Sequence, residues 1–116
     1  MNVLVVEDEA LVSLEVQDLV ERSGHVCVGP VATVNEACQL IDTMPLEAAL
    51  LDVWLKNDEF VWPAAQKLVS RGVPFAFVSA RAPDGIAPEF RDRPLFPKPM
   101  SELRVRRWLD EVGSGR

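Results

Sequence analysis

The sequence predicts an α/β domain, a doubly wound parallel sheet with helices on both faces. Four short apolar runs, each closed by polar or charged residues, carry this prediction: residues 2–6, 48–51, 73–79 and 94–97. An apolar run of this length is typical of a strand that is buried on both faces. Helical periodicity between the runs, with short connections, indicates repeated βα units in one sheet.

The first βα unit begins with a strand at residues 2–6. Glu7, Asp8 and Glu9 follow this strand and are expected to open a helix, because the positive end of the helix dipole favours negative charge. The helix has one apolar face at helical spacing, made of Val12, Val16, Leu19 and Val20. Gly24 is its expected end.

The second unit combines a short strand at residues 25–29 with a helix. Thr33 or Asn35 is the expected N-cap of this helix, since either side chain can accept a hydrogen bond from a free backbone amide. Pro45 marks its end, because proline cannot continue a helix.

The third unit starts with a strand at residues 47–52, followed by a loop at residues 53–59. Pro63 suits the first turn of the next helix, which is expected to run to about Arg71. A fourth strand is expected at residues 73–79.

The segment after the fourth strand does not have a helical pattern. Residues 80–93 contain Pro83, Gly85 and Pro88 and have no apolar period. Proline and glycine at this density resist a regular helix, so a loop or a single turn is expected in place of a fourth helix.

The chain closes with a fifth strand at residues 94–97 and a helix from Ser101 to about Val112. Its length of 116 residues fits one domain, expected at residues 1–112, and residues 113–116 are expected to form a flexible tail.

The composition limits the classes of function. A net charge of −6 disfavours nucleic acid as a partner, because binding phosphates needs a basic surface. No apolar stretch approaches the roughly 20 residues of a membrane span, and no charged leader precedes the first strand. Cys27 and Cys38 match no metal spacing, which is typical of two buried thiols in a reducing, cytoplasmic environment.

Polar side chains follow four of the expected strands at their carboxyl ends. They are Glu7, Asp8, Asp52, Ser79 and Lys98. The carboxyl ends of parallel strands meet at one edge of the sheet, where open α/β sheets bind ligands, so we expect these side chains to form one site. Three neighbouring carboxylates need a compensating cation, and Mg²⁺ prefers carboxylate and phosphate oxygens.

The chemistry of this cluster is that of phosphoryl transfer. Asp52 is the expected nucleophile, because it ends a central strand and a carboxylate can accept a phosphoryl group. Lys98 would place a positive charge, and Ser79 a hydroxyl donor, beside the phosphoryl oxygens. The new dianion could form about 1–3 charge-assisted hydrogen bonds, enough to reorder nearby loops.

Over essentially the whole chain, this arrangement resembles the receiver domain of two-component response regulators. The resemblance implies a flavodoxin-like sheet in the order 2-1-3-4-5 and phosphorylation of Asp52 by a sensor histidine kinase or a histidine phosphotransfer protein, with a downstream protein partner. It implies that Mg²⁺ is held by Glu7, Asp8, Asp52 and the backbone carbonyl of Trp54. It also implies a cis peptide bond at Lys98–Pro99, and a chain that catalyses only its own phosphorylation and dephosphorylation.

Several segments are similar to the FAT GUY group of single-domain receivers, which lack an ordinary fourth helix. These segments are Asp52–Leu55, Trp62–Ala65, Gly72–Phe77 and Pro94–Pro99. The usual partners of that group are sensor kinases of the HWE type. This chain departs from the group's pattern where Ser79 replaces Thr and where Ala80 and Arg81 replace Gly-Tyr.

The switch of ordinary receivers is expected to be altered. Their aromatic residue lies three positions before the lysine, where this chain has Leu95, which has no hydroxyl. Residues 80–93, with Arg81 as a possible phosphate-facing arm, are the candidate movable element.

A partner surface is expected beside the site. Leu11 and Leu14 lie off the inner face of the first helix and, with Met100, could form an apolar patch on which a kinase or phosphotransfer helix docks. Trp54, two positions after Asp52, either packs at the mouth of the site or contacts a partner.

Two other functions remain open from the residues alone. A degenerate receiver would act only as a protein-binding module, and the departures at Ser79 and Leu95 and the missing fourth helix favour it, whereas the complete set of site residues favours phosphorylation. A small phosphatase with an aspartyl nucleophile commonly has a second acid two positions later, where this chain has Trp54. A dinucleotide site is disfavoured because the first turn lacks Gly-x-Gly-x-x-Gly.

Overall fold

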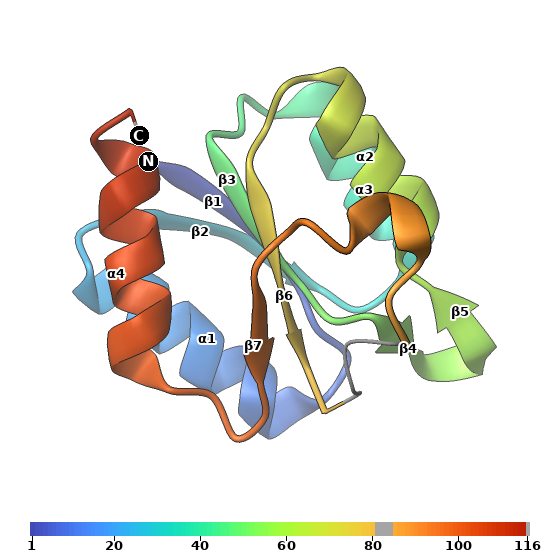
Figure 1. The fold of residues 1–116 in the computed structure, drawn as a ribbon, viewed down its shortest axis with the longest axis horizontal. Coiled ribbons are helices and arrows are strands. Elements are labelled where there is room, and N and C mark those ends of the chain that lie inside the picture. The colour runs from blue at the N-terminus through green and yellow to red at the C-terminus, as the bar shows by residue number, and fades with distance from the viewer. Residues whose placement is uncertain (81–84, 116) are drawn as a thin grey trace.

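The computed structural model describes residues 1–80 and 85–115, without the side chain of Asn57. Its central sheet has five parallel strands, β1 (Asn2–Val6), β2 (Val26–Val31), β3 (Ala48–Leu51), β6 (Phe75–Ser79) and β7 (Leu95–Pro97). Four helices surround it, α1 (Ala10–Arg22), α2 (Val34–Thr43), α3 (Trp62–Ser70) and α4 (Glu102–Gly113). The spatial order β2-β1-β3-β6-β7 confirms the flavodoxin-like arrangement expected from the sequence (Figure 1).

Helices cover both faces of the sheet, so the sheet divides the apolar core into two parts. Helices α1 and α4 lie on one face, and α2 and α3 lie on the other (Figure 1). Every residue of β3 and β6 is buried, which explains why these strands are continuous apolar runs. At the end of β6, the polar residue Ser79 is buried as well.

The caps of two helices follow the sequence. The Oγ1 of Thr33 accepts a hydrogen bond from the backbone amide of Glu36 at 3.2 Å and caps α2. Ser101 caps α4 in the same way, accepting from the amide of Arg104 at 3.4 Å. These bonds satisfy amides that have no partner inside the helix.

The expectation that Glu7, Asp8 and Glu9 open the first helix is wrong for Glu7 and Asp8, and only Glu9 lies at the helix start, as its N-cap. Helix α1 begins at Ala10, and its first turn holds no acidic residue. The amide of Glu7 instead donates to the carbonyl of Val31 at 2.9 Å, which continues the pairing of β1 with β2. Glu7 and Asp8 therefore belong to the edge of the sheet, whereas Glu9 is the N-cap residue of α1 and its carbonyl accepts from the amide of Ser13 at 2.8 Å.

Strand β2 extends two residues beyond its expected end. Gly29 has a φ of +99°, and a Cβ at this position would lie 2.9 Å from the backbone nitrogen of Val31. Only glycine fits this geometry, and it allows the strand to continue through Pro30 to Val31.

The segment expected as a loop after β3 contains a small antiparallel ribbon. Its strands are β4 (Trp54–Leu55) and β5 (Glu59–Phe60), joined by a 3₁₀ turn, η1 (Lys56–Asp58). Trp54 lies opposite Phe60, and Asp58 adopts the left-handed conformation with a φ of +56°. The ribbon follows Asp52 directly and so belongs to the surroundings of the site.

The described part of the segment between β6 and β7 includes the 3₁₀ turn η3 (Pro88–Phe90). This finding agrees with the expectation of a loop or a single turn. Ile86 and Phe90 are buried in the core shared with α2 and α3. Arg81, the expected phosphate-facing arm, lies outside the described residues.

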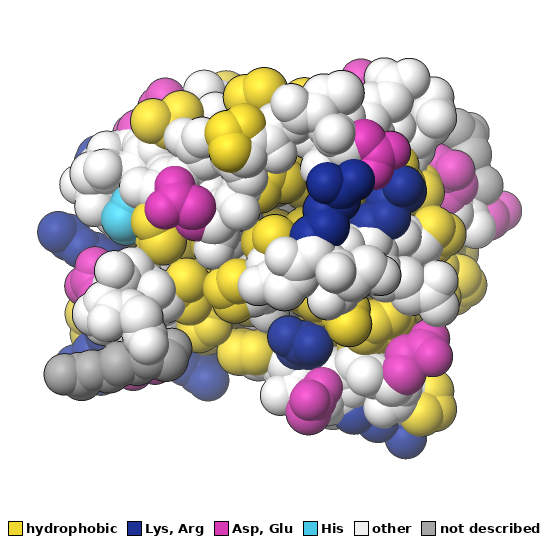
Figure 2. All heavy atoms as spheres, turned by 90° about the horizontal axis from the view of Figure 1, so that it is seen from above, with side chains coloured by type: hydrophobic (Ala, Val, Ile, Leu, Met, Phe, Trp, Pro, Cys, Tyr) yellow, Lys and Arg dark blue, Asp and Glu magenta, His cyan; other side chains and the backbone are white. Residues whose placement is uncertain are grey.

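The surface seen from above the view of Figure 1 carries basic side chains beside acidic ones, with hydrophobic atoms between them (Figure 2). Between α2 and α3, Lys67 and Arg71 both pair with Asp42, at 3.0 and 2.9 Å. Cys27 and Cys38 are unpaired and only partly buried, less than the sequence suggested. Among the described helices, none has the length and apolar character that crossing a membrane requires.

Candidate functional site

Four strands deliver the expected site residues to one edge of the sheet. Glu7 and Asp8 follow β1, Asp52 follows β3, Ser79 ends β6 and Lys98 follows β7. The backbone carries part of this convergence, because the amide of Asp52 donates to the carbonyl of Val6 and the amide of Lys98 donates to the carbonyl of Ser79. Residues 46 positions apart, Asp52 and Lys98, come into direct contact.

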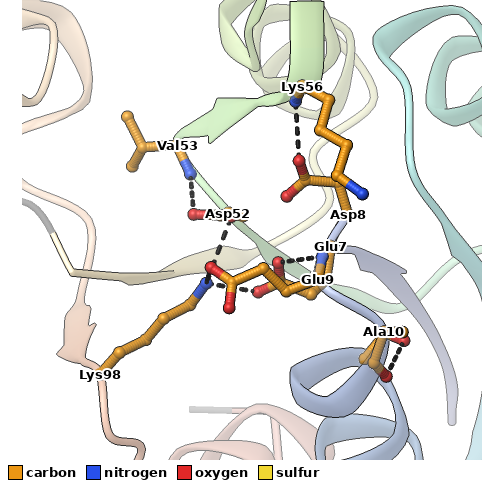
Figure 3. A network of polar contacts seen from close by, with 9 residues as sticks. Glu7, Asp8, Glu9, Ala10, Asp52, Val53, Lys56 and Lys98 are labelled. Carbon is orange, nitrogen blue, oxygen red and sulfur yellow. Dashed lines mark hydrogen bonds and ion pairs between the residues drawn. The ribbon is translucent and has the colours of Figure 1, made fainter.

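Lys98 is the cation at the centre of the site (Figure 3). Its Nζ lies 2.7 Å from Oε1 of Glu7, 3.3 Å from Oδ2 of Asp52 and 3.6 Å from Oε1 of Glu9. The Glu7 and Asp52 carboxylates are buried, with 2% and 8% of their side chains exposed. Ion pairs in such a place are screened much less than pairs on the surface.

Backbone amides hold the other oxygens of the three acids. Oδ1 of Asp52 accepts from the amide of Val53 at 2.9 Å, and Oε2 of Glu7 accepts from the amide of Glu9 at 3.0 Å. Oδ2 of Asp8 accepts from the amide of Lys56 at 2.7 Å, which ties the end of β1 to the ribbon after β3 (Figure 3). Each of the three carboxylates is therefore oriented by a main-chain donor, and those of Glu7 and Asp52 are also held by the charge of Lys98.

Burial perturbs the ionisation of the site. It raises the pKa of Glu7 to about 7, although the hydrogen bonds from Lys98 and from the Glu9 amide act in the opposite direction. Burial also raises the pKa of Asp52, against the nearby positive charge of Lys98. Burial alone would lower the pKa of Lys98, but its hydrogen bond to Glu7 and the charge of Asp52 raise it. Burial therefore disfavours the charged forms of Glu7 and Asp52, and Lys98 offsets this only in part.

The acids have the geometry and the chemistry of a cation site. One carboxylate oxygen from each of Glu7, Asp8 and Asp52 lies within 4.8 Å of the others. A hard divalent cation with oxygen ligands, such as Mg²⁺, fits this donor set and would place positive charge beside three carboxylates.

Ser79 and Trp54 occupy different parts of the site. Ser79 is almost completely buried, with 1% exposure, at the end of β6. Trp54 is 44% exposed and stacks on Phe60, with ring centroids 6.0 Å apart. Trp54 therefore packs inside the protein and also presents an accessible face, so packing at the mouth of the site and contact with a partner are compatible.

Two features of the site were missed by the sequence reasoning. The first is Glu9, whose carboxylate is the third to contact Lys98, whereas the sequence suggests that this acid serves the helix dipole. The second feature is the backbone amide of Lys56, which donates to Asp8, and no sequence signal identifies a backbone donor of this kind. The ribbon that carries this amide could have been suspected from the aromatic residues at both of its ends.

Comparison with known proteins agrees with this arrangement. No family model matches the chain, and no curated protein does. Among solved structures, SdrG from Sphingomonas melonis Fr1 is 34% identical and has a TM-score of 0.86, with 97% of this chain and 95% of SdrG covered. The BeF₃-activated conformation of SdrG is 35% identical over 94% of this chain and 92% of that one, with a TM-score of 0.78.

Two further structures are described as receiver domains. The receiver domain of the PhyR response regulator from Erythrobacter litoralis is 30% identical, covers 96% of this chain and 88% of its own length, and has a TM-score of 0.83. The receiver domain of a sensor histidine kinase from Pseudomonas aeruginosa PAO1, solved with magnesium in its active-site cleft, covers 97% of both chains. At 19% identity and a TM-score of 0.78, it shares the fold alone.

Together, the sheet order, the converging acids and lysine, and these similarities define the class of protein. The chain belongs to the receiver domains of two-component response regulators.

Proposed function

We propose that this receiver accepts a phosphoryl group on Asp52 from a phosphohistidine donor, with Mg²⁺ in the acidic cluster. The observation that supports this proposal most directly is that Lys98 Nζ lies within 3.3 Å of both Glu7 and Asp52. These two residues form the acidic cluster together with Asp8. The BeF₃-activated form of SdrG adds support, since BeF₃ mimics a phosphoryl group on a carboxylate.

The reaction is a transfer between two nucleophiles. A carboxylate oxygen of Asp52 attacks the phosphorus, the phosphorus–nitrogen bond to the donor imidazole breaks, and its electron pair stays on the imidazole. Glu7, Asp8, Asp52 and the backbone carbonyl of Trp54 would hold Mg²⁺, and the bound ion would neutralise charge on the transferred phosphoryl group. Lys98 and Ser79 would then contact the phosphoryl oxygens, so that placement and charge supply the catalysis.

The proposal is tested by the mass of the protein after treatment with acetyl phosphate and Mg²⁺. We expect a gain of one phosphoryl group, absent in Asp52→Asn and when the metal is removed with EDTA. Asp18→Asn is the matched control, because Asp18 lies on the exposed face of α1 and pairs with Arg22 on the same helix. A phosphoryl group that persists in Asp52→Asn would refute the assignment of the acceptor.

The same test separates the alternative functions. A degenerate receiver that acts only by binding would gain no mass under any of these conditions. A phosphatase would turn over a phosphomonoester, whereas we propose that this chain catalyses only its own phosphorylation and dephosphorylation. The complete set of acids and lysine at the site favours phosphorylation over the degenerate reading.

We propose that the donor docks on α1 beside the site. Leu11 and Leu14 are 77% and 60% exposed, while Met100, expected to complete the patch, packs partly into the core between α1 and α4. Two exposed leucines one turn apart suit the apolar face of a helix from a histidine kinase or phosphotransfer protein. Kinases of the HWE type, and membership of the FAT GUY group, remain predictions from the sequence.

The docking proposal is tested with Leu14→Glu. It should slow transfer from a phosphorylated histidine phosphotransfer protein and leave phosphorylation by acetyl phosphate unchanged. Val69→Glu on α3, at a position that is 46% exposed, is the control for an added surface charge. Equal transfer rates in the two variants would mean that α1 is not the docking surface.

A further inference from the structure

Four aromatic side chains form a stack that begins beside the site and ends in the segment that replaces the fourth helix. The ring centroids of Trp54 and Phe60 are 6.0 Å apart, those of Phe60 and Trp62 are 5.7 Å apart, and those of Trp62 and Phe90 are 5.7 Å apart. The interplanar angles are 16°, 4° and 27°, so successive rings are close to parallel and stack with an offset. We refer to these four residues as the aromatic ladder.

The first end of the ladder is tied to two of the site carboxylates. The ribbon that carries Trp54 and Phe60 is held at Val53, whose amide donates to Asp52, and at Lys56, whose amide donates to Asp8. Both carboxylates are in the acidic cluster, so a change in their charge or position acts directly on both ends of β4 (Figure 3).

The ribbon transmits such a change to its second strand. Trp54 and Phe60 face each other as a cross-strand pair, and the amide of Val61 donates to the carbonyl of Val53 at 3.0 Å. Paired positions move together, because the ladder hydrogen bonds and the side-chain pair restrain both strands. Trp62 is the first residue of α3 and lies against Phe60 on the far side of this pair.

The second end of the ladder lies in η3. Phe90 is 3% exposed, stacks on Trp62, and makes edge contacts with Phe75 and Phe77 of β6. The segment is closed on itself, since the Nε of Arg91 donates to the carbonyl of Ile86 at 2.9 Å. A shift of Phe90 would therefore move residues 86–91 as a unit.

We infer that the aromatic ladder couples the state of the Asp52 site to the position of residues 86–91. Stacked rings restrain one another, so a displacement of Trp54 at the exposed end acts on Phe60 and Trp62 and reaches Phe90 at the buried end. The inference rests on the proposed function in one respect, that a phosphoryl group or its mimic binds at Asp52. It assigns Phe60, which stacks on both Trp54 and Trp62, the role of a positioning residue.

A second route to the same segment runs along the chain from Ser79. Phe77 lies two residues before Ser79 and makes an edge contact with Trp62, with centroids 5.9 Å apart. A pull on Ser79 could therefore move η3 without the ribbon. The two routes are tested by changing one residue of each, Phe60 in the aromatic ladder for the first and Ser79 at the end of β6 for the second.

The experiment follows backbone amide NMR signals during titration with BeF₃ and Mg²⁺. In the unmodified protein we expect shifts at residues 52–56 and at residues 86–91. Phe60→Leu removes the ring and keeps an apolar side chain at a position that is 42% exposed, so the fold should be retained. This variant should keep the shifts at residues 52–56 and lose at least half of the shift at residues 86–91.

Controls distinguish the ladder from a general loss of structure. Phe60→Tyr keeps the ring and should restore the response at residues 86–91, while Leu103→Ala, a change at an exposed position on α4, should leave it unchanged. Full retention of the shifts at residues 86–91 in Phe60→Leu, with their loss in Ser79→Ala, would overturn the inference in favour of the second route. Absence of shifts at residues 52–56 in the unmodified protein would instead contradict the proposed function.

Discussion

Lys98 holds the acidic site together, and its removal offers the sharpest test of the electrostatic account. Its Nζ lies within 3.6 Å of three carboxylates, and only 12% of its side chain is exposed. Lys98→Met keeps an apolar stem of similar length and removes the charge. Glu7 and Asp52 would then remain buried without a cation.

The expected loss of stability follows from burial. Removing one partner of a buried ion pair costs about 3–5 kcal/mol, because the remaining charge is uncompensated. Glu7 limits this loss, since its pKa is already raised to about 7 and would rise further without Lys98, which lowers it. We therefore expect Lys98→Met to lose roughly 2–4 kcal/mol at pH 7.5 without metal, and roughly 1 kcal/mol at pH 5, where Glu7 is protonated.

Urea denaturation, followed by tryptophan fluorescence in EDTA, measures this loss. Lys67→Met is the matched control, because Lys67 pairs with Asp42 on the surface and such pairs contribute only about 0–1 kcal/mol. Added Mg²⁺ should restore part of the stability of Lys98→Met by supplying the missing charge. A loss no larger than that of Lys67→Met at pH 7.5, or one that does not change with pH, would refute this account of the site.

Three further predictions concern the site and the core. The pKa of Glu7 rises from 4.5 to about 7 on folding, so without metal its contribution to stability is complete below pH 4.5 and is lost as the pH rises through 7. Over this pH range the unmodified protein should lose roughly 2 kcal/mol of unfolding free energy relative to Glu7→Gln, as measured by urea midpoints. Phe90→Ala should cost about 3–5 kcal/mol of unfolding free energy in thermal denaturation, whereas Phe60→Ala, at a half-exposed position, should cost about 1 kcal/mol; equal costs would contradict the burial. Burial raises the pKa of the Cys27 thiol to about 11, so its alkylation by iodoacetamide at pH 8 should be about 100-fold slower than in urea-unfolded protein, followed by mass spectrometry.

The sequence was a reliable guide wherever the signal was local. The apolar runs of β3 and β6 identify strands buried on both faces, and each run ends at a residue that the fold brings to the site. The prolines and glycine within residues 80–93 disfavour a helix by their own backbone restrictions, and the short 3₁₀ turn η3 in the described part of this segment agrees with this. Thr33 and Ser101 cap their helices because the capping bond spans only three residues.

Local rules were wrong where one residue type serves two purposes. Acids before a helix are explained equally well by the helix dipole and by a cation site, and sequence position alone does not separate these explanations. In the structure, Glu7 and Asp8 lie at the sheet edge and α1 begins only at Ala10. The amide of Glu7 pairs with Val31, a contact across 24 residues that no local pattern records.

By itself the sequence determined which residues end the parallel strands, and therefore which side chains could meet. Only the tertiary structure decided how closely they meet: the 2.7 Å contact of Lys98 with Glu7, the burial that raises the pKa of Glu7 to about 7, and the stacking of Trp54, Phe60, Trp62 and Phe90. The physical reason is that strand and helix signals depend on neighbours along the chain, whereas ion pairing, desolvation and ring stacking depend on distances that exist only after the whole sheet has formed.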